Sequence, residues 1–268
     1  MIYLSSFQLC DNKLNNGSTN IYPYNIFQHK YIEPFLFEPI TVLYGDNGSG
    51  KSTLLNIIAN KLELEGKEKC NGYGLYFEKF ISKCQLTLGS DENGRTFRRV
   101  PENSRYIKSE DILYEIKKIQ QETVLEEGYI YEHVRRGMTK EQAKNKLDTD
   151  AGGNRMEIMK FAQEKYSNGE TAMQLIDDYL QPDGLYLLDE PEVSLSPSNQ
   201  VKLSEEIKYM ARLLSCQFII ATHSPFLLGT MDCKIYNLDS NEYEVKKWSQ
   251  LKNIRYFYEF FQQHHDEF

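Results

Sequence analysis

The chain has 268 residues and a net charge of −8, with 40% hydrophobic and 26% charged residues. This composition is ordinary for a globular protein with a sizeable core, and the acidic balance excludes a chain that coats a polyanion with its whole surface. The five scattered cysteines predict a reduced, cytoplasmic protein without a disulfide framework or zinc site, and no apolar run suggests a signal peptide or a membrane span.

The first part of the chain predicts strands around one glycine-rich loop. Residues 1–44 alternate short apolar runs with turn residues, which is typical of antiparallel strands. A buried strand is expected over 39–45, and apolar residues at helical spacing predict a helix over 51–62. Weaker patterns predict short strands over 74–77 and 84–88.

The remaining elements alternate between helices and strands. Residues 109–166 are expected to be mostly helical, with a capping box from Thr139 to Gln142. Buried strands are predicted over 184–192 and 216–224. The other predicted elements are a helix over 199–214, a closing hairpin over 233–239 and 243–248, and an aromatic-rich helix over 252–268.

The alternation of strands and helices predicts an α/β fold with a helical insertion. We expect a single domain over residues 1–268 with three sub-regions. These are an N-terminal β region with the glycine-rich loop (1–108), a helical insertion (109–166) and a C-terminal part (167–268).

Residues 45–53, GDNGSGKST, fit the pattern of a phosphate-binding loop, although a plain glycine-rich turn is the alternative. Glycines let backbone N–H groups curl around an anion, and the following helix directs its positive end at the same phosphates. Lys51 is expected to bind the β- and γ-phosphates of ATP, and the Ser52 hydroxyl is expected to bind Mg²⁺. The predicted ATP-binding residues are Gly45, Asp46, Asn47, Gly48, Ser49, Gly50, Lys51, Ser52 and Thr53.

The predicted strand LYLLDEPE ends in two acids. It places Asp189 at the carboxyl edge of a parallel sheet, where ligands bind, and Asp189 can hold Mg²⁺ there. Glu190 follows directly and can act as the base that polarises an attacking water. Without the loop, the same pattern would fit a strand that ends in an acidic turn.

Two further segments stand in a fixed order with these motifs. The segment SNGET (167–171) could be a turn that N-caps a helix, and it begins 22 residues before Asp189. His223 follows Asp189 by 34 residues, at the end of the next apolar strand. This order of motifs resembles the ABC-type ATPase superfamily. The resemblance assigns the signature motif to Ser167, Asn168, Gly169 and Glu170, and the switch that contacts the γ-phosphate to His223.

The resemblance implies an ABC-type P-loop NTPase core and a mechanism. Such ATPases close as head-to-tail homodimers around two Mg-ATP, and the signature of one protomer completes the site of the other. Lys51, Glu190 and His223 are then the catalytic residues, with Mg²⁺ as the cofactor. A lone protomer would have an incomplete site, so turnover should depend on protein concentration.

The segment DEPE resembles the non-transporter branch of the superfamily, which includes RecF-, SMC- and OLD-like ATPases, because Glu192 stands where transporters commonly have threonine. The spacing is too short for an SMC arm, and the tail is too short for an OLD nuclease. We expect a motor or switch that acts on a partner protein, in DNA maintenance or phage defence. The alternatives are the ATP-binding subunit of an ABC transporter and a binding module with little turnover.

Some features of the family have no clear match in the chain. Ser109 or Glu110 stands where a glutamine is expected at a strand end. Tyr22, Tyr24 and Phe27 are the candidates to stack on adenine.

A basic cluster gives the only hint of nucleic-acid binding, and we interpret it as a solvated face with surface salt bridges. Its residues are Arg95, Arg98, Arg99, Arg105 and Lys108. The pair His264 and His265 is interpreted as an exposed helix end rather than a metal site.

Overall fold

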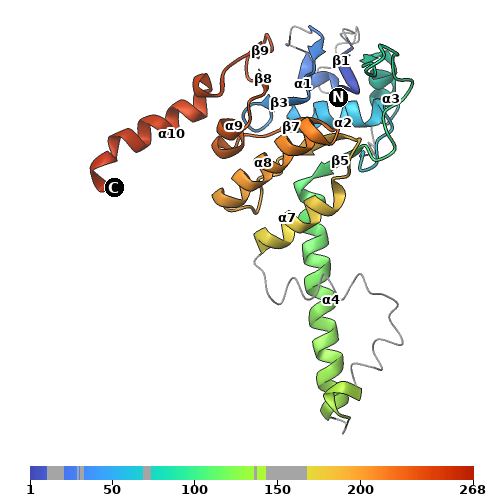
Figure 1. Ribbon diagram of the computed structural model, residues 1–268, viewed down its shortest axis with the longest axis vertical. Coiled ribbons are helices and arrows are strands. Elements are labelled where there is room, and N and C mark those ends of the chain that lie inside the picture. The colour runs from blue at the N-terminus through green and yellow to red at the C-terminus, as the bar shows by residue number, and fades with distance from the viewer. Residues whose placement is uncertain (11–20, 29, 31–32, 69–73, 136–137, 143–167) are drawn as a thin grey trace.

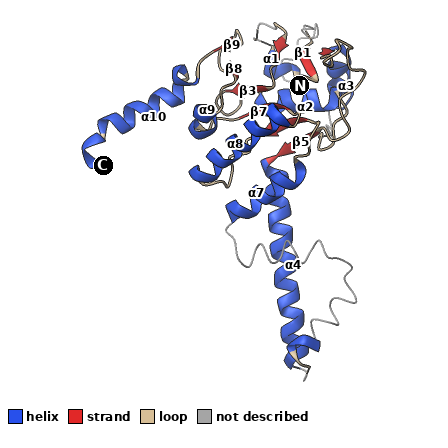
Figure 2. Ribbon diagram, viewed as in Figure 1, coloured by secondary structure: helices blue, strands red, loops and turns tan. Residues whose placement is uncertain are grey.

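The computed structural model describes residues 1–10, 21–28, 30, 33–68, 74–135, 138–142 and 168–268, in which the strands form two sheets (Figure 1, Figure 2). The larger sheet is parallel except at one edge and has the order β5 (Arg105–Lys108), β6 (Leu185–Asp189), β7 (Gln217–Ala221), β3 (Ile40–Tyr44), β8 (Lys234–Asn237) and β9 (Glu244–Val245). The smaller, antiparallel sheet has the order β2 (Phe35–Leu36), β1 (Leu4–Gln8) and β4 (Gln85–Leu88). This architecture confirms the predicted α/β fold class with an N-terminal antiparallel β region.

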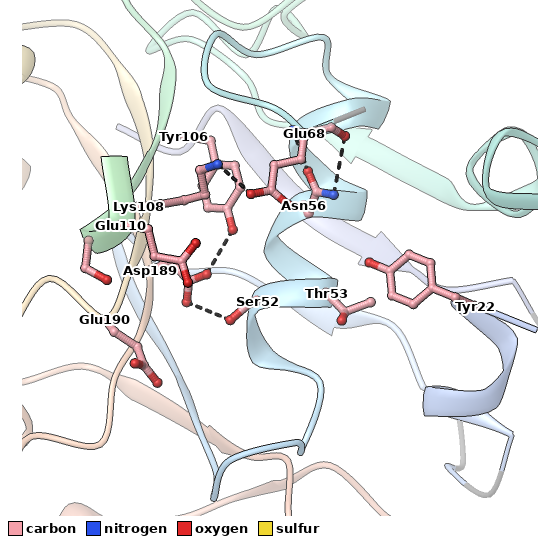
Figure 3. A pocket seen from close by; sticks show the side chains of 11 residues that line it. Tyr22, Ser52, Thr53, Asn56, Glu68, Tyr106, Lys108, Glu110, Asp189 and Glu190 are labelled. Atoms are coloured by element: carbon pink, nitrogen blue, oxygen red, sulfur yellow. Dashed lines mark hydrogen bonds and ion pairs between the residues drawn. The ribbon is translucent and has the colours of Figure 1, made fainter. Parts of the chain in front are cut away.

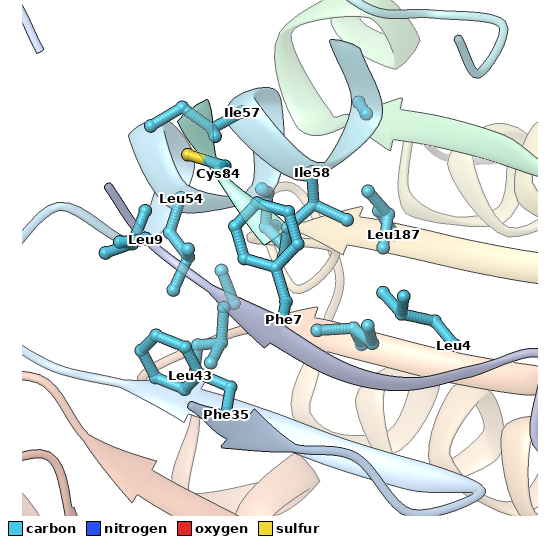
Figure 4. Packing of buried hydrophobic residues seen from close by; sticks show 14 of the residues in the cluster. Leu4, Phe7, Leu9, Phe35, Leu43, Leu54, Ile57, Ile58, Cys84 and Leu187 are labelled. Carbon is cyan, nitrogen blue, oxygen red and sulfur yellow. The ribbon is translucent and has the colours of Figure 1, made fainter. Parts of the chain in front are cut away.

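The central strands β3, β6 and β7 are buried at every position, which explains their uninterrupted apolar sequences. Successive side chains point to opposite faces of the sheet, so Leu187 and Leu188 enter two different hydrophobic clusters. On one face, the sheet packs against α2 (Lys51–Lys61) and the smaller sheet, where Phe7 lies among Leu54 and Ile58 (Figure 4).

Helices cover the opposite face of the large sheet. They are α7 (Asn168–Tyr179), α8 (Pro197–Leu213) and α9 (Pro225–Thr230). Ile220 of β7 belongs to the same buried cluster as Leu203 and Ile207 of α8. Because both faces of the sheet are covered, a ligand is expected to bind at the carboxyl ends of the parallel strands.

Two helices project from the body of the molecule (Figure 1). The first turns of α4 (Ser109–Arg135) contribute Ile112 and Ile116 to the core, and the rest of the helix extends away. The helix α10 (Lys252–Gln263) buries only Ile254. Shorter elements are α1 (Tyr24–Phe27), η1 (Trp248–Gln250) and η2 (His265–Glu267).

One predicted strand is wrong. Residues 74–77 belong to the helix α3 (Gly74–Lys83), not to a strand. Phe77 and Phe80 lie three residues apart, so both reach the core from one face of this helix. A four-residue pattern cannot distinguish this arrangement from a short strand, and residues 24–27, which lie within the region predicted as strands, are likewise helical.

Two other predicted local features, the capping box and the closing hairpin, are confirmed. The Thr139 N–H donates to Gln142 Oε1 at 3.0 Å, and the Gln142 N–H donates to Thr139 Oγ1 at 3.2 Å, as a capping box requires. The closing hairpin is present as the antiparallel pair β8 and β9. None of the helices in the described ranges is long and apolar enough to cross a membrane.

A fully buried glutamine joins the two sheets. Gln217 Oε1 accepts hydrogen bonds from the N–H groups of Tyr3 and Leu4, both at 2.8 Å. Its Nε2 atom donates to Leu4 O at 2.8 Å and to Glu38 O at 3.2 Å. The first strand of the chain is therefore fixed to the first residue of β7 by side-chain hydrogen bonds.

We expect Gln217→Leu to lower the free energy of unfolding by about 3 kcal/mol or more, because it leaves two buried N–H groups without acceptors. Urea denaturation followed by circular dichroism measures this loss. The control is Gln85→Leu on the exposed side of β4, which should change the free energy by no more than about 0.5 kcal/mol. A similar small loss for Gln217→Leu would contradict the role of this side chain.

Candidate active site

The loop over residues 45–50 joins β3 to α2 and has the backbone that its glycines predict. Gly48 and Gly50 have φ angles of 83° and 97°, a region that glycine adopts without strain. A Cβ atom on Gly50 would lie 2.8 Å from Ile26 Cγ2. Glycine is therefore required at the start of α2 by both conformation and space.

The tip of the loop is exposed, and the first residue of this tip, Asp46, is held by two hydrogen bonds. Asp46, Asn47 and Gly48 are exposed. The Asp46 N–H donates to Asp239 Oδ1 at 2.7 Å, and Asn253 Nδ2, in the first turn of α10, donates to Asp46 Oδ1 at 3.0 Å. The base of the C-terminal helix thus helps to hold the loop.

Lys51 is the buried cation of the site, with only 5% of its surface exposed. Its Nζ atom donates to the backbone oxygens of Gly45 at 2.8 Å and Asp46 at 3.2 Å. The same atom lies 3.9 Å from Glu190 Oε1. The ammonium group is therefore held at the mouth of the loop, between the loop carbonyls and the acids that follow β6.

Asp189 is buried at the carboxyl end of β6 and accepts two hydrogen bonds. Ser52 Oγ donates to its Oδ1 atom at 3.1 Å, and the Tyr106 hydroxyl donates to its Oδ2 atom at 2.9 Å (Figure 3). Burial raises the pKa of Asp189 to about 6, against the effect of the two hydrogen bonds, which lower it. The pKa of Tyr106 is also raised, first by burial and then by the neighbouring carboxylate.

The oxygens of Ser52 and Asp189 suit Mg²⁺. This ion is usually held by one or two protein oxygen ligands together with substrate phosphates. In the part of the chain that the structure describes, no group of three or more His, Cys, Asp or Glu side chains could hold a metal ion by itself. The two predicted metal ligands lie 3.1 Å apart, with Ser52 in the first turn of α2 and Asp189 at the end of β6.

A pocket of about 240 Å³ opens beside these two side chains (Figure 3). Ser109 and Glu110, the first residues of α4, line it together with Thr53 and Glu190. The segment in which we expected a substitute for the family's glutamine therefore lines the same pocket as Ser52 and Asp189.

Glu190 and His223 lie side by side at the ends of β6 and β7. Glu190 has a φ of 49°, and its N–H donates to Ala221 O at 2.8 Å. Its Oε1 atom is 3.6 Å from His223 Nδ1. The side chains of Glu190 and His223 are 30% and 47% exposed, so both can reach a ligand at this edge.

The predicted signature lies apart from this pocket. Ser167 is outside the described residues, and α7 begins at Asn168, so that Gly169 and Glu170 fall in its first turn. Figure 1 shows this turn at the outer end of α7, away from β5. The pocket beside Ser52 is lined by neither Gly169 nor Glu170.

The three aromatic candidates for adenine stacking occupy different places. Tyr24 and Phe27 are 8% and 4% exposed and pack against Phe80 in the core. Tyr22 lines the pocket and stacks on Phe77, with ring centroids 5.7 Å apart. Of the three, Tyr22 is thus the side chain at the candidate site.

The basic cluster is only partly a solvated face. Arg99 forms an exposed ion pair with Glu102, as expected. Arg105 and Lys108 instead hold the segment after α2, through Glu65 and Glu68, both at 2.5 Å. Their position on β5 brings them to that segment, and their side chains are only 25% and 13% exposed.

The tail histidines lie at the end of α10, as predicted. His264 Nδ1 is 2.6 Å from Glu267 Oε1, and His265 is exposed.

Sequence reasoning missed two side chains of the site. Tyr106 lies on β5, which pairs with β6, but a lone tyrosine in a four-residue strand carries no signal of a site. Glu192 was noted only as a mark of the non-transporter branch. It is 8% exposed and accepts a hydrogen bond from the His223 N–H at 3.1 Å.

We expect Asp189→Asn to stabilise the nucleotide-free protein at pH 7.5 by about 1–3 kcal/mol. The folded-state pKa of Asp189 is raised from 3.8 to about 6, so this stability is fully present below pH 3.8 and is lost as the pH rises through about 6. The neutral amide avoids this loss. Urea denaturation without Mg²⁺ at pH 7.5 and pH 5 measures the gain, which should shrink at pH 5.

The control for this prediction is Asp178→Asn, because Asp178 is exposed on α7. This change should alter the free energy of unfolding by no more than about 0.5 kcal/mol. An Asp189→Asn variant that is less stable than the parent at pH 7.5 would contradict the burial cost.

Solved structures of SMC head domains and of an ATP-binding cassette are similar to the chain. An Smc head domain with an extended coiled coil, bound to the C-terminal domain of ScpA from Pyrococcus furiosus, is 15% identical with a TM-score of 0.46, covering 97% of this chain and 100% of that one. The SMC head domain from Thermotoga maritima is 13% identical with a TM-score of 0.47, and the match covers 92% of this chain and 99% of that one. A dimeric ATP-binding cassette with ADP and Pi is 16% identical (TM-score 0.44; coverage 94% and 100%).

No curated protein matches the chain. A family model described as "AAA domain, putative AbiEii toxin, Type IV TA system" matches residues 79–229. The match contains Asp189, Glu190 and His223, and the glycine-rich loop precedes it. Since it spans more than half of the 268 residues, the chain belongs to this AAA-domain family.

Proposed function

We propose that this chain is an ATPase that binds Mg-ATP at residues 45–53 and hydrolyses it in a head-to-tail homodimer. The observation that supports this most directly is the convergence of Lys51, Asp189, Glu190 and His223 at one edge of the parallel sheet. Lys51 Nζ and His223 Nδ1 lie 3.9 Å and 3.6 Å from the same Glu190 oxygen. A cation, a base and a switch residue within contact of one another form a suitable site for phosphoryl transfer to water.

Each residue has a distinct role in the proposed reaction. Lys51 binds the β- and γ-phosphate oxygens, and the N-terminal N–H groups of α2 add partial positive charge. Ser52 and Asp189 would hold Mg²⁺, which neutralises phosphate charge when bound. Glu190 takes the proton of the attacking water, and His223 contacts the γ-phosphate. The Ser49 hydroxyl, buried and without a partner among the described residues, is available to a phosphate oxygen.

The dimer is proposed because the predicted signature does not line the pocket of its own chain. A signature supplied by a second copy, from residues 167–170, would bring a helix N-terminus to the exposed side of Glu190 and His223. Hydrolysis would then be coupled to opening of the pair, which suits a motor or switch for a partner protein. The family's description as a toxin of a type IV toxin–antitoxin system is compatible with a role in defence and offers no support for a transporter subunit.

We expect Glu190→Gln to lower ATP hydrolysis at least about 100-fold, because the amide cannot take the proton of water. ATP binding should be retained, so an ATP-bound dimer should accumulate. Phosphate release measures turnover, and light scattering with ATP and Mg²⁺ measures the mass of the complex. The matched control is Lys51→Ala, which should lose ATP binding and remain a monomer. Parental turnover in Glu190→Gln would exclude Glu190 as the base.

Turnover per molecule should fall as the parent protein is diluted, because mass action dissociates the dimer that completes the site. Phosphate release measured over a dilution series, with inert carrier protein at constant concentration, tests this expectation. The carrier prevents surface adsorption from imitating the effect. Turnover per molecule that stays constant across the series would contradict a site shared by two copies.

A further inference from the structure

The turn after Asp189 carries a second buried acid. Glu192 is 8% exposed, and its Oε1 atom accepts hydrogen bonds from Thr222 Oγ1 at 2.7 Å and from the His223 N–H at 3.1 Å. Its Oε2 atom is buried without a partner among the described residues. Burying a carboxylate that has an unpaired oxygen costs free energy of folding, which indicates that Glu192 has a role other than stability.

The backbone of the turn directs Glu192 back towards the end of β7. The positive φ of Glu190 reverses the chain directly after β6. Two further turn hydrogen bonds follow, from the Val193 N–H to Glu190 O at 3.1 Å and from the Leu195 N–H to Glu192 O at 3.0 Å. The acid that follows Glu190 by two residues therefore meets the strand end that carries His223.

A chain of hydrogen bonds extends this contact. Thr222 Oγ1 accepts from the Ser224 N–H at 3.0 Å, so its own proton is free to be donated to Glu192. Ser224 Oγ donates to Gln200 Oε1 at 2.6 Å, and Gln200 Nε2 donates to Leu195 O at 2.9 Å. The turn after β6 and the loop after β7 are thus joined at two points.

The histidine ring stands between two carboxylates. His223 Nδ1 is 3.6 Å from Glu190 Oε1 and 3.6 Å from Glu192 Oε1, while the ring itself is 47% exposed. At this separation neither contact is a hydrogen bond. The ring is therefore placed mainly through its backbone, and Glu192 is the side chain that accepts the backbone N–H.

We propose that Glu192 is a positioning residue that holds His223 beside Glu190 for hydrolysis, through the Thr222 hydroxyl and the His223 N–H. This inference rests on the proposed function, because it concerns the role of His223 in ATP turnover. Glu192 takes no proton and contacts no phosphate. Its loss leaves two donors without an acceptor and releases the loop over 222–224.

The test compares Glu192→Ala with Glu192→Gln. The alanine variant should lower kcat on the order of 10- to 100-fold, because small misplacements of a catalytic group have effects of this size. Its affinity for ATP should equal that of the parent, since the glycine-rich loop and Lys51 are untouched. The glutamine variant should recover most of the kcat, because its amide oxygen can accept the same two hydrogen bonds.

Phosphate release as a function of ATP concentration gives kcat and KM, and binding of a fluorescent ATP analogue gives the affinity directly. The control is Glu205→Ala, which removes an exposed glutamate of α8 that pairs with Lys208 and should keep the parental kcat. Parental kcat in Glu192→Ala would overturn the inference. A glutamine variant as slow as the alanine variant would also overturn it, because the charge rather than the acceptor would then matter.

If Glu192→Ala does not fold, Thr222→Val removes one of the two donors with little change in volume. It should lower kcat without a change in ATP affinity, and an unchanged kcat would overturn the inference. The proposed function is tested independently of Glu192. Parental ATP turnover in Glu190→Gln would contradict the proposed function, whatever the kcat of the Glu192 variants. If Glu190→Gln hydrolyses ATP slowly while Glu192→Ala keeps the parental kcat, the inference about Glu192 is overturned and the proposed function stands.

Discussion

The parallel pairing of β3, β6 and β7 is the constraint on which the candidate site depends. In this register, Asp189 lies opposite Ala221, and Ala221 lies opposite Leu43. The three strands therefore end at the same level, and each is followed within two residues by a part of the site. The sheet can form because these strands are apolar on both faces and are covered on both sides.

The same edge collects charges that cost stability. Lys51, Asp189 and Glu192 are each less than 9% exposed, although charged side chains are rarely buried. Burial raises the pKa of Asp189 even though two hydroxyls donate to it. Such a concentration of buried charge is typical of functional sites, where a fold carries groups that its own stability does not need.

Local sequence patterns correctly predicted those elements whose conformation is set by the residue types within the element itself. The glycine-rich loop, the capping box at Thr139 and the buried strand that ends at Asp189 are of this kind. The pattern over 74–77 was misleading, because Phe77 belongs with Phe80 on a helix that the tertiary core selects. The salt bridges expected for Arg105 and Lys108 are present, but their partners Glu65 and Glu68 lie on a distant segment that the sequence pattern did not indicate.

The sequence by itself determined the order of the motifs, the strands that carry them and the identity of the residues at the strand ends. The tertiary structure alone decided which side chains support them. Tyr106 meets Asp189 across 83 residues, Glu192 meets the His223 N–H across 31, and Gln217 meets the Leu4 N–H across 213. The physical reason is that periodicity encodes the burial of a single element, whereas these contacts depend on which elements the whole core brings together.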